Sequence, residues 1–427
     1  MAGERLRVLF CDHLNLARGK YLPRAGTGDG RVRFCQGVFA IGYDKSLLAA
    51  PGSRMTEGLP DMVAAYRAED IREGWQPGTR VVVADLYESD GTPLPLCGRG
   101  LLKRSIRDWE EAGYRPQVGI ELEAYAFQRN GEGRLLPYDT PGAYVYGTGP
   151  LADPRRFTDA VWSRASEAGF TLDGLTSEYD SPQFEFTLAH GDALKAVDDA
   201  FLFRLLAREV AIEHGLLLTF MPKPLPERGG SGVHVNVSFR DRGGRNAFDT
   251  GPSGGLSALM RGCIAGLMHH HRAMAGLLAP TVNSYERLRP ASLSGYWRSW
   301  GIDHRGVAVR VSAEGGPAAR FEHRMADGAA NPYTATATVL QAARLGVRGG
   351  YDLQPAETGD GFTRQDAEEG VPASLSAALE ALAADRKLVA ALGERLVENH
   401  IFVKRDEVAK TAALEGDALR DFYIHYI

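Results

Sequence analysis

The stretch "VGIELEAYAF", Val118 to Phe127, decides the fold. It is typical of a β-strand because it is mostly apolar, yet it carries Glu121 and Glu123 two residues apart. Side chains alternate between the two faces of a strand, so both carboxylates project from one face, about 6.6 Å apart along the chain. At an effective dielectric constant of 20 they repel by roughly 2–3 kcal/mol. A solvent-facing strand would tolerate this pair, whereas a functional face should be accompanied by complementary cations.

Three later segments repeat this alternation of an apolar and a polar face. An antiparallel sheet that is buried on one side explains the alternation itself. It does not explain why the polar face carries Glu, His and Arg where less costly polar residues would serve. The polar faces hold Gln183, Glu185 and Thr187 in "EYDSPQFEFTL", with Glu178 just upstream, then His234, Asn236 and Ser238 in "GVHVNVSF", and Arg320, Glu322 and Arg324 in "ARFEHRM".

Added together, these polar faces supply one imidazole and five carboxylates. Such an oxygen-rich set suits two hard divalent ions, Mg²⁺ or Mn²⁺, and hardly suits tetrahedral zinc. Five arginines add cations for phosphate and carboxylate groups, and metals with arginine forks are the means of phosphoryl transfer. The candidate ligands are Glu121, Glu123, Glu178, Glu185, His234 and Glu322, and the arginines are Arg287, Arg305, Arg310, Arg320 and Arg324.

Length and composition limit the other possibilities. The chain has 427 residues, of which 44% are hydrophobic, with a net charge of −5. It is long enough for two or three domains, and it has no broad field that would attract nucleic acid or membranes. Its four cysteines are scattered and are expected to be reduced, structural thiols. We find neither a signal peptide nor an apolar run of 18 residues, and we therefore expect a cytoplasmic location.

The order of predicted elements indicates an α+β fold. Residues 1–100 form a small mixed domain of apolar strand runs and Gly/Pro-rich connections, and residues 101–427 form a larger domain. The triple histidine at 269–271 lies inside a predicted helix, where only one or two of three consecutive residues share a face, and is expected to be structural. Helices are predicted over residues 100–114, 154–169, 192–215, 255–278 and 374–396.

At this point the residues match a known family. The motifs, in order, are "GIELEAYAF", "SEYDSPQFEF", "FMPKP…GGSGVHVNVS", "APTVNSYERLRP", "HRGVAVRV" and "RFEHRMADGAANPY". Through them the chain resembles the glutamine synthetase superfamily, of the bacterial class I type, over nearly its whole length. The resemblance implies a β-grasp domain followed by a catalytic domain with a curved antiparallel sheet and flanking helices. It also implies a homo-dodecamer of two stacked hexameric rings, with each active site between neighbouring subunits.

The resemblance also implies roles for single residues. One metal would be held by Glu123, Glu178 and Glu185, and a second by Glu121, His234 and Glu322. Arg287, Arg324 and Gly230 occupy the positions that bind glutamate, and Arg305, Arg324 and Glu178 are expected to take part in catalysis. ATP would phosphorylate the γ-carboxylate of glutamate, and an amine would then displace phosphate to leave an amide. The positions that bind the nucleotide phosphates are Asn236, Ser238, Arg305, Arg310 and Arg320.

The chain departs from the family pattern at four places. Leu293 stands where ammonia-using members have a glutamate, six residues after Arg287. The "DGSS" latch from a neighbouring subunit is at best "DKSL", in which Asp44 remains. Gly229 replaces the usual asparagine before the glycine of the substrate loop. Phe362 stands in the place of the tyrosine that some bacterial members adenylylate, so control by that modification is not expected.

Leu293 bears most directly on the substrate. An ammonium site needs carboxylates, whereas a leucine adds apolar surface, about 1.5–3 kcal/mol if a ligand buries it. We therefore predict a glutamate–amine ligase that uses an organic primary amine, such as a polyamine, ethanolamine or an alkylamine. Glutamine synthesis from ammonium, a two-metal phosphohydrolase and an inactive family member remain the alternatives. The six filled metal positions argue against an inactive member, because buried charges are costly to keep.

Overall fold

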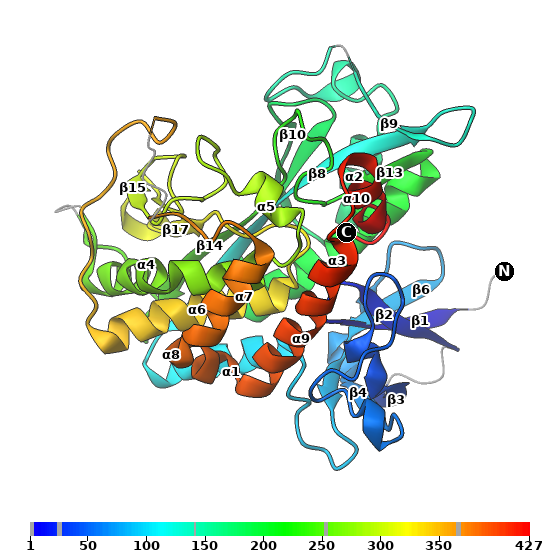
Figure 1. Ribbon diagram of the computed structural model, residues 1–427, viewed down its shortest axis with the longest axis horizontal. Coiled ribbons are helices and arrows are strands. Elements are labelled where there is room, and N and C mark those ends of the chain that lie inside the picture. Colours follow the sequence, from blue (N-terminus) through cyan, green and yellow to red (C-terminus); the bar gives the residue numbers. More distant parts are fainter. Residues whose placement is uncertain (1–3, 24–27, 141, 252–254, 364–368) are drawn as a thin grey trace.

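The computed structural model describes residues 4–23, 28–140, 142–251, 255–363 and 369–427 (Figure 1). At its centre is a ten-stranded sheet built around one long strand, β8, to which five other strands are hydrogen-bonded. The main path of the sheet is, in spatial order, β10 (Leu172–Ser177), β11 (Gln183–Leu188), β8 (Arg115–Arg129), β14 (Val233–Arg240), β17 (Phe321–His323), β16 (Val309–Val311) and β15 (Trp300–Ile302). The short strands β9 (Leu135–Pro137), β12 (Gly191–Asp192) and β13 (Leu216–Thr219) also pair with β8.

The pairings along this path are antiparallel up to β16, and β15 and β16 then run parallel. The expected antiparallel sheet is therefore found, with one parallel pair at its edge, where the connection over residues 303–308 brings the chain back beside β15 in the same direction. The register of the pairings decides which side chains meet on each face. His234 lies opposite Glu121, and Glu185 lies opposite Glu123, so four polar side chains share one face of the sheet.

The other face of the sheet forms the core. Val118, Ile120 and Leu122 alternate with the two glutamates of β8 and are buried. Helix α3 packs against β8, and α4 packs against α6, in the layer of helices below the sheet in Figure 1. The helices are α1 (Gly98–Glu111), α2 (Phe157–Glu167), α3 (Ala193–Glu213), α4 (Ala258–Leu278), α5 (Ser284–Arg287), α6 (Pro332–Gly349), α7 (Leu375–Ala384), α8 (Arg386–Leu392), α9 (Glu394–Thr411) and α10 (Gly416–Tyr423).

One predicted helix is wrong. Residues 374–396 were expected to form a single helix, but the structure divides them into α7, α8 and the start of α9. Ser374 caps α7 by accepting a hydrogen bond from the Ala377 amide, and Asp385 caps α8 in the same way at Leu388. Gly393, with φ of 96°, ends α8. A capping side chain satisfies the free amides of a new helix, which makes a break at Asp385 favourable even inside an apolar pattern.

The strands before α1 form two small sheets. The first has the order β2 (Ala17–Pro23), β1 (Arg5–Cys11), β6 (Thr79–Val83) and β5 (Arg72–Glu73), and the second has the order β3 (Gly30–Cys35), β4 (Asp61–Tyr66) and β7 (Asp85–Tyr87). They lie together to one side of the large sheet and its helices (Figure 1). The predicted α+β fold, with N-terminal strands before a large sheet and its flanking helices, is confirmed.

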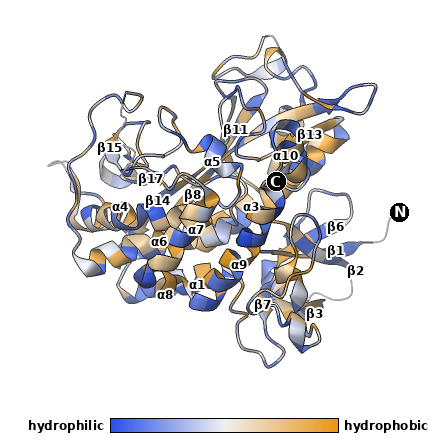
Figure 2. Ribbon diagram, in the orientation of Figure 1, coloured by the Kyte–Doolittle hydropathy of each residue, from blue (hydrophilic) through white to orange (hydrophobic). Residues whose placement is uncertain are grey.

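The distribution of hydropathy agrees with this layering. Apolar residues are frequent along the packed helices α6 and α7, whereas the exposed ends of helices and many loops are hydrophilic (Figure 2). None of the helices in the described parts of the chain is long and apolar enough to cross a membrane.

Candidate active site

The polar face of the sheet gathers a first group of possible metal ligands from three neighbouring strands. The Nδ1 atom of His234 lies 3.1 Å from Glu121 Oε2 and 3.3 Å from Glu322 Oε1. Ligand atoms of the three side chains all lie within 4.8 Å of one another. This group contains the three residues that the family resemblance assigned to one metal.

A second group lies one step along the same face. Glu123 and Glu185 face each other across β8 and β11, and His234 Nε2 lies 3.5 Å from Glu123 Oε1. These three residues also have ligand atoms within 4.8 Å of one another. Glu178 lies beside this group at the end of β10, and His234 takes the third place that the sequence gave to Glu178. One imidazole therefore stands between the two groups.

The charges on this face are crowded. Burial, followed by the negative charges of Glu121 and Glu123, raises the pKa of Glu185 to about 8. Burial and the charge of Glu123 also raise the pKa of Glu178. Burial opposes ionisation of Glu121 too, but hydrogen bonds from His234 and Asn236 outweigh it and lower that pKa to about 2. Carboxylates that repel one another in this way are typical of a site that takes up cations, so the donor set fits hard divalent ions.

Two arginines meet at Glu322. Arg310 donates to Glu322 Oε2 at 3.1 Å and to Asp303 Oδ1 at 2.5 Å. Arg324 donates to Glu322 Oε1, and its other terminal nitrogen lies 3.2 Å from the carbonyl oxygen of Leu293. Glu322 therefore joins the first group to a pair of guanidinium groups, which can neutralise phosphate or carboxylate charge.

The other predicted arginines are placed differently. Arg287 is buried and donates to the carbonyl oxygens of Met325, at 2.8 Å, and Arg324, at 3.0 Å. Both of its terminal nitrogens are thus bonded to the backbone, close to His234, because a Cβ at Gly232 would lie 2.5 Å from one of these nitrogens and 3.0 Å from His234 Nε2. Arg305 is exposed, and Arg320 donates to Glu314, 3.0 Å away in the connection between β16 and β17. The structure thus brings Arg310 and Arg324 to the carboxylates and leaves Arg305 and Arg320 farther out.

The loop over residues 228–232 lies against the second group. The amide of Gly232 donates to Glu123 Oε2 at 2.7 Å, and Gln183 Nε2 donates to the carbonyl oxygen of Gly230 at 3.0 Å. Tyr125 Oη donates to the carbonyl oxygen of Gly229 at 2.9 Å. A Cβ at Gly230 would lie 2.6 Å from Arg287 Cγ, so only glycine fits between this loop and the arginine.

Comparison with known proteins shows the family. The model of the glutamine synthetase catalytic domain matches residues 95–421. The chain belongs to the glutamine synthetase family. Glutamine synthetase from Pyrococcus furiosus is 32% identical over 394 residues, 86% of this chain and 88% of that protein. Gamma-glutamylethanolamide synthetase GlnA4 from Streptomyces coelicolor is 32% identical over 344 residues, 78% of this chain and 72% of that protein.

Solved structures agree with this assignment. A crystal structure of a novel glutamine synthase homolog has a TM-score of 0.84 and 25% identity, and covers 100% of this chain and 99% of that one. GmaS without ligand has a TM-score of 0.82 and 27% identity, and covers 99% of this chain and 97% of that one. Proteins of the glutamine synthetase family are ATP-dependent ligases that form C–N bonds and use divalent metals, so the chain is an enzyme of this class.

Two positions where this glutamine synthetase family member departs from the pattern have clear surroundings. Leu293 is 45% exposed, and its carbonyl oxygen is bound by Arg324, so the backbone of this apolar residue lies at the arginine that also binds Glu322. Asp44 lies 2.8 Å from Lys410 of α9 and accepts from Ser46 Oγ at 2.7 Å. These contacts tie Asp44 to its own chain.

Residues outside the carboxylate face have structural surroundings. His270 lies 2.5 Å from Asp385, His271 lies 3.0 Å from the carbonyl oxygen of Tyr296, and His269 stacks on a tyrosine ring, as a structural triple histidine requires. Phe362 is exposed. The four cysteines are free thiols, and three of them are buried.

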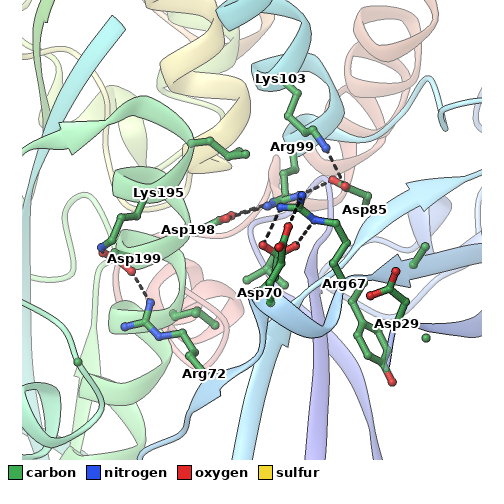
Figure 3. Close-up of a pocket in the computed structure, with 18 of the residues that line it drawn as sticks. Asp29, Arg67, Asp70, Arg72, Asp85, Arg99, Lys103, Lys195, Asp198 and Asp199 are labelled. Atoms are coloured by element: carbon green, nitrogen blue, oxygen red, sulfur yellow. Dashed lines mark hydrogen bonds and ion pairs between the residues drawn. The ribbon is translucent and has the colours of Figure 1, made fainter. Parts of the chain in front are cut away.

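A large cavity lies elsewhere, between the N-terminal strands and helices α1 and α3 (Figure 3). Its volume is about 1290 Å³, and several of its charged side chains pair with one another. Arg99 binds Asp198 at 2.8 Å, and Lys103 binds Asp85 at 2.7 Å. We therefore regard this cavity as a polar junction, distinct from the carboxylate face.

Sequence reasoning missed several residues around the site. Gln183 was on the polar face of its strand but received no role, and Tyr125 continues the row of Glu121 and Glu123 by the same alternation. Asp303 lies in a turn, where no periodic pattern marks it. Asp180 lies in the turn before β11, where the amide of Gly229 donates to its carboxylate.

Proposed function

We propose that the chain is an ATP-dependent glutamate–amine ligase that forms a γ-glutamyl amide from an organic primary amine. A polyamine, ethanolamine and an alkylamine are the candidate amines. The observation that carries this proposal is the exposed apolar residue Leu293, whose carbonyl oxygen is bound by Arg324, the arginine that also binds Glu322. An apolar contact there favours an amine with a carbon tail over ammonium. The relative GlnA4, named for a γ-glutamylethanolamide, supports the same direction.

The two carboxylate groups would hold two or more Mg²⁺ or Mn²⁺ ions. Glu121, His234 and Glu322 form one set, and Glu123 and Glu185 with Glu178 form the other. The ions would neutralise the negative charge that accumulates on a transferred phosphoryl group. His234, between the two sets, fixes their separation.

The other polar residues would position the two substrates. Asn236, Ser238, Arg305, Arg310 and Arg320 would hold the phosphates of ATP at one end of the face. Gly230, Arg324 and the buried charge of Arg287 would receive the acid. Phosphate is a better leaving group than oxide, so phosphorylation of the γ-carboxylate prepares it for attack by the amine. Arg305, Arg324 and Glu178 would stabilise charge during that exchange.

The assembly belongs to the same proposal. A β-grasp domain over residues 1–100 would be followed by the catalytic domain over residues 101–427, although α1 already begins at Gly98. Twelve chains would form two stacked hexameric rings in the cytoplasm. Each carboxylate face would then be completed by a neighbouring subunit. Asp44 of that subunit is the candidate residue for this contact.

The proposal is tested by measuring ADP release with glutamate, ATP and Mg²⁺ against a panel of amines that includes ammonium. We expect one organic amine to have a higher kcat/KM than ammonium, after correction for the free-base fraction at one pH. Mass spectrometry should identify the γ-glutamyl amide, and EDTA should abolish the reaction.

Each contrary result points to a definite alternative. A preference for ammonium would make the chain a glutamine synthetase. ADP release without glutamate would indicate a phosphohydrolase. No ADP release with any amine would indicate an inactive member of the family.

A further inference from the structure

Asp180 holds a negative charge that nothing in the described parts of the chain neutralises by direct contact. It lies in the turn between β10 and β11 and is half-buried. Its Oδ2 atom accepts a hydrogen bond from the amide of Gly229, and its carboxylate forms no ion pair with any described residue. Arg228 and Lys223, two cations whose charges act on Asp180, are engaged elsewhere. Arg228 binds Asp139 at 2.6 Å, and Lys223 donates to the carbonyl oxygen of Arg228.

The position of Asp180 follows from the register of the sheet. Along β8, Glu121 and Glu123 are followed on the same face by Tyr125, which lies opposite Gln183. Tyr125 and Gln183 hold the carbonyl oxygens of Gly229 and Gly230. Asp180 therefore lies near the part of the polar face that follows Glu123 along β8. Asn236 lies opposite Gly119, at the other end of this row of polar side chains. If the nucleotide binds near Asn236, a second substrate that binds on the far side of the two carboxylate groups would reach Asp180.

The loop leaves room for this carboxylate. A Cβ added at Gly229 would lie 3.1 Å from Asp180 Oδ2 and 3.6 Å from Gln183 Oε1, and the first of these distances is closer than such atoms usually approach. At this point the loop therefore offers only backbone, and Asp180 supplies the charged side chain. One of its oxygens is bound to an amide, and the other has no hydrogen-bond partner among the described residues.

We propose that Asp180 binds a substrate ammonium group. This inference rests on the proposed ligase function, in which both organic substrates bring such a group. Glutamate carries an α-ammonium, and the acceptor amine arrives largely protonated at neutral pH. A hydrogen bond between opposite charges is roughly twice as strong as one between neutral groups. At a half-buried position such as that of Asp180, it is partly protected from solvent. Asp180 would therefore select substrates by charge, in addition to the apolar selection proposed for Leu293.

The test uses Asp180→Asn in the full-length enzyme. Asparagine keeps an oxygen that accepts from the Gly229 amide but removes the charge. We expect the KM of one organic substrate to rise at least tenfold, with the KM of ATP within twofold of wild type. A rise for glutamate identifies the α-ammonium, and the enzyme should then also lose its preference for glutamate over glutarate, which lacks that group. A rise for the amine identifies the acceptor.

Asp139→Asn is the matched control, because Asp139 anchors the same loop through Arg228 and has no place in the proposed site. It should leave both KM values within twofold of wild type. Asp180→Ser, which also keeps an oxygen acceptor without charge, repeats the test if the asparagine variant is unstable. Unchanged KM values, a loss confined to kcat, or an equal effect of Asp139→Asn would overturn the inference.

These outcomes are separate from those for the proposed function. If wild-type enzyme forms no γ-glutamyl amide, the proposed function fails and the Asp180 inference fails with it. If wild-type enzyme forms the amide and Asp180→Asn has normal KM values, only the Asp180 inference fails.

Discussion

Glu123 has two neighbours that make different demands on it. Its Oε2 atom accepts from the Gly232 amide at 2.7 Å, and its Oε1 atom faces His234. Glu123→Gln keeps an acceptor for the loop but removes the charge that a divalent ion needs. We expect turnover at ordinary Mg²⁺ to fall by roughly 100-fold or more, because an oxygen cage that loses one carboxylate binds the ion weakly.

A magnesium titration of initial rates would measure this loss, with Glu132→Gln in an exposed hairpin turn as the control. Near-normal activity of Glu123→Gln would contradict the two-metal proposal. Recovery at high Mg²⁺ would show that the lost group acts through metal affinity.

Arg324 uses both arms of its guanidinium, one on Glu322 and one on the Leu293 carbonyl oxygen. Lysine offers a single ammonium in place of this planar fork, so Arg324→Lys cannot reproduce both contacts. We expect the KM of glutamate to rise by roughly 10- to 100-fold, since a hydrogen bond to a charged group is worth about 1.5–3 kcal/mol. Steady-state kinetics with each substrate varied in turn would check it. A change confined to the KM of ATP would show that Arg324 does not bind the acid.

Leu293 is the residue on which the choice of amine depends. Leu293→Glu adds a charge that attracts ammonium and that the tail of an organic amine would have to desolvate. We expect the ratio of kcat/KM for the best amine to that for ammonium to fall by about tenfold. Both proteins are compared at one pH with free-base concentrations corrected. An unchanged ratio would show that Leu293 does not line the amine pocket.

Single strands were predictable because apolar and polar residues alternate with a period of two in each segment. The alternation in residues 118–127, 183–188 and 233–239 placed the polar side chains on one face, and the structure brings many of them together. The pairing of distant segments was not predictable from that pattern. His234 stands between both carboxylate groups because β14 lies directly beside β8. The alternation within a single segment does not indicate which strands will be neighbours. Asp303 and Asp180 were missed because turns have no periodicity.

Helices α4 and α6 cross at their glycines. A methyl group at Gly266 would overlap the carbonyl oxygen of Ala342, and one at Gly346 would overlap the carbonyl oxygen of Gly262. Backbone cannot move aside as a flexible side chain can, so Gly266→Ala should force the helices apart. We expect it to lower the free energy of unfolding by about 1–3 kcal/mol, despite the better helix propensity of alanine.

Urea denaturation followed by circular dichroism would measure this change. Gly131→Ala is the control, because a Cβ there meets nothing within 4 Å. A Gly266→Ala protein as stable as wild type would mean that the two helices separate at little cost.

At the scale of the whole molecule, the N-terminal strands are joined to the helices both by a shared apolar core, which includes Leu9 and Val81, and by polar contacts. Arg7 binds Glu209 of α3 at 2.8 Å, and Trp75 Nε1 donates to the same carboxylate at 2.6 Å. Arg72 and Asp199 form a further pair across the cavity of Figure 3. Contacts of this kind fix the orientation of the N-terminal strands, and in the proposed assembly that orientation would decide what they present to a neighbouring chain.

The proposed assembly has a definite mass. Twelve chains of 46.3 kDa give about 556 kDa, which sedimentation velocity can distinguish from smaller oligomers. We expect activity to follow the fraction of this species when the protein is diluted, because each carboxylate face would need its neighbour. Full activity in a sample that contains only single chains would contradict a site shared between subunits.

The central position of β8 has a consequence for the kinetics of opening. Amides exchange with heavy water only when their hydrogen bonds break, and strands paired within a sheet open last. Residues 118–127 should therefore be among the slowest in the chain to take up deuterium. A metal ion bound to the glutamates on that strand would therefore dissociate into solvent while the backbone hydrogen bonds of the strand remain intact. The loop over 228–232, tethered largely by side chains, should exchange sooner and should report the arrival of substrate.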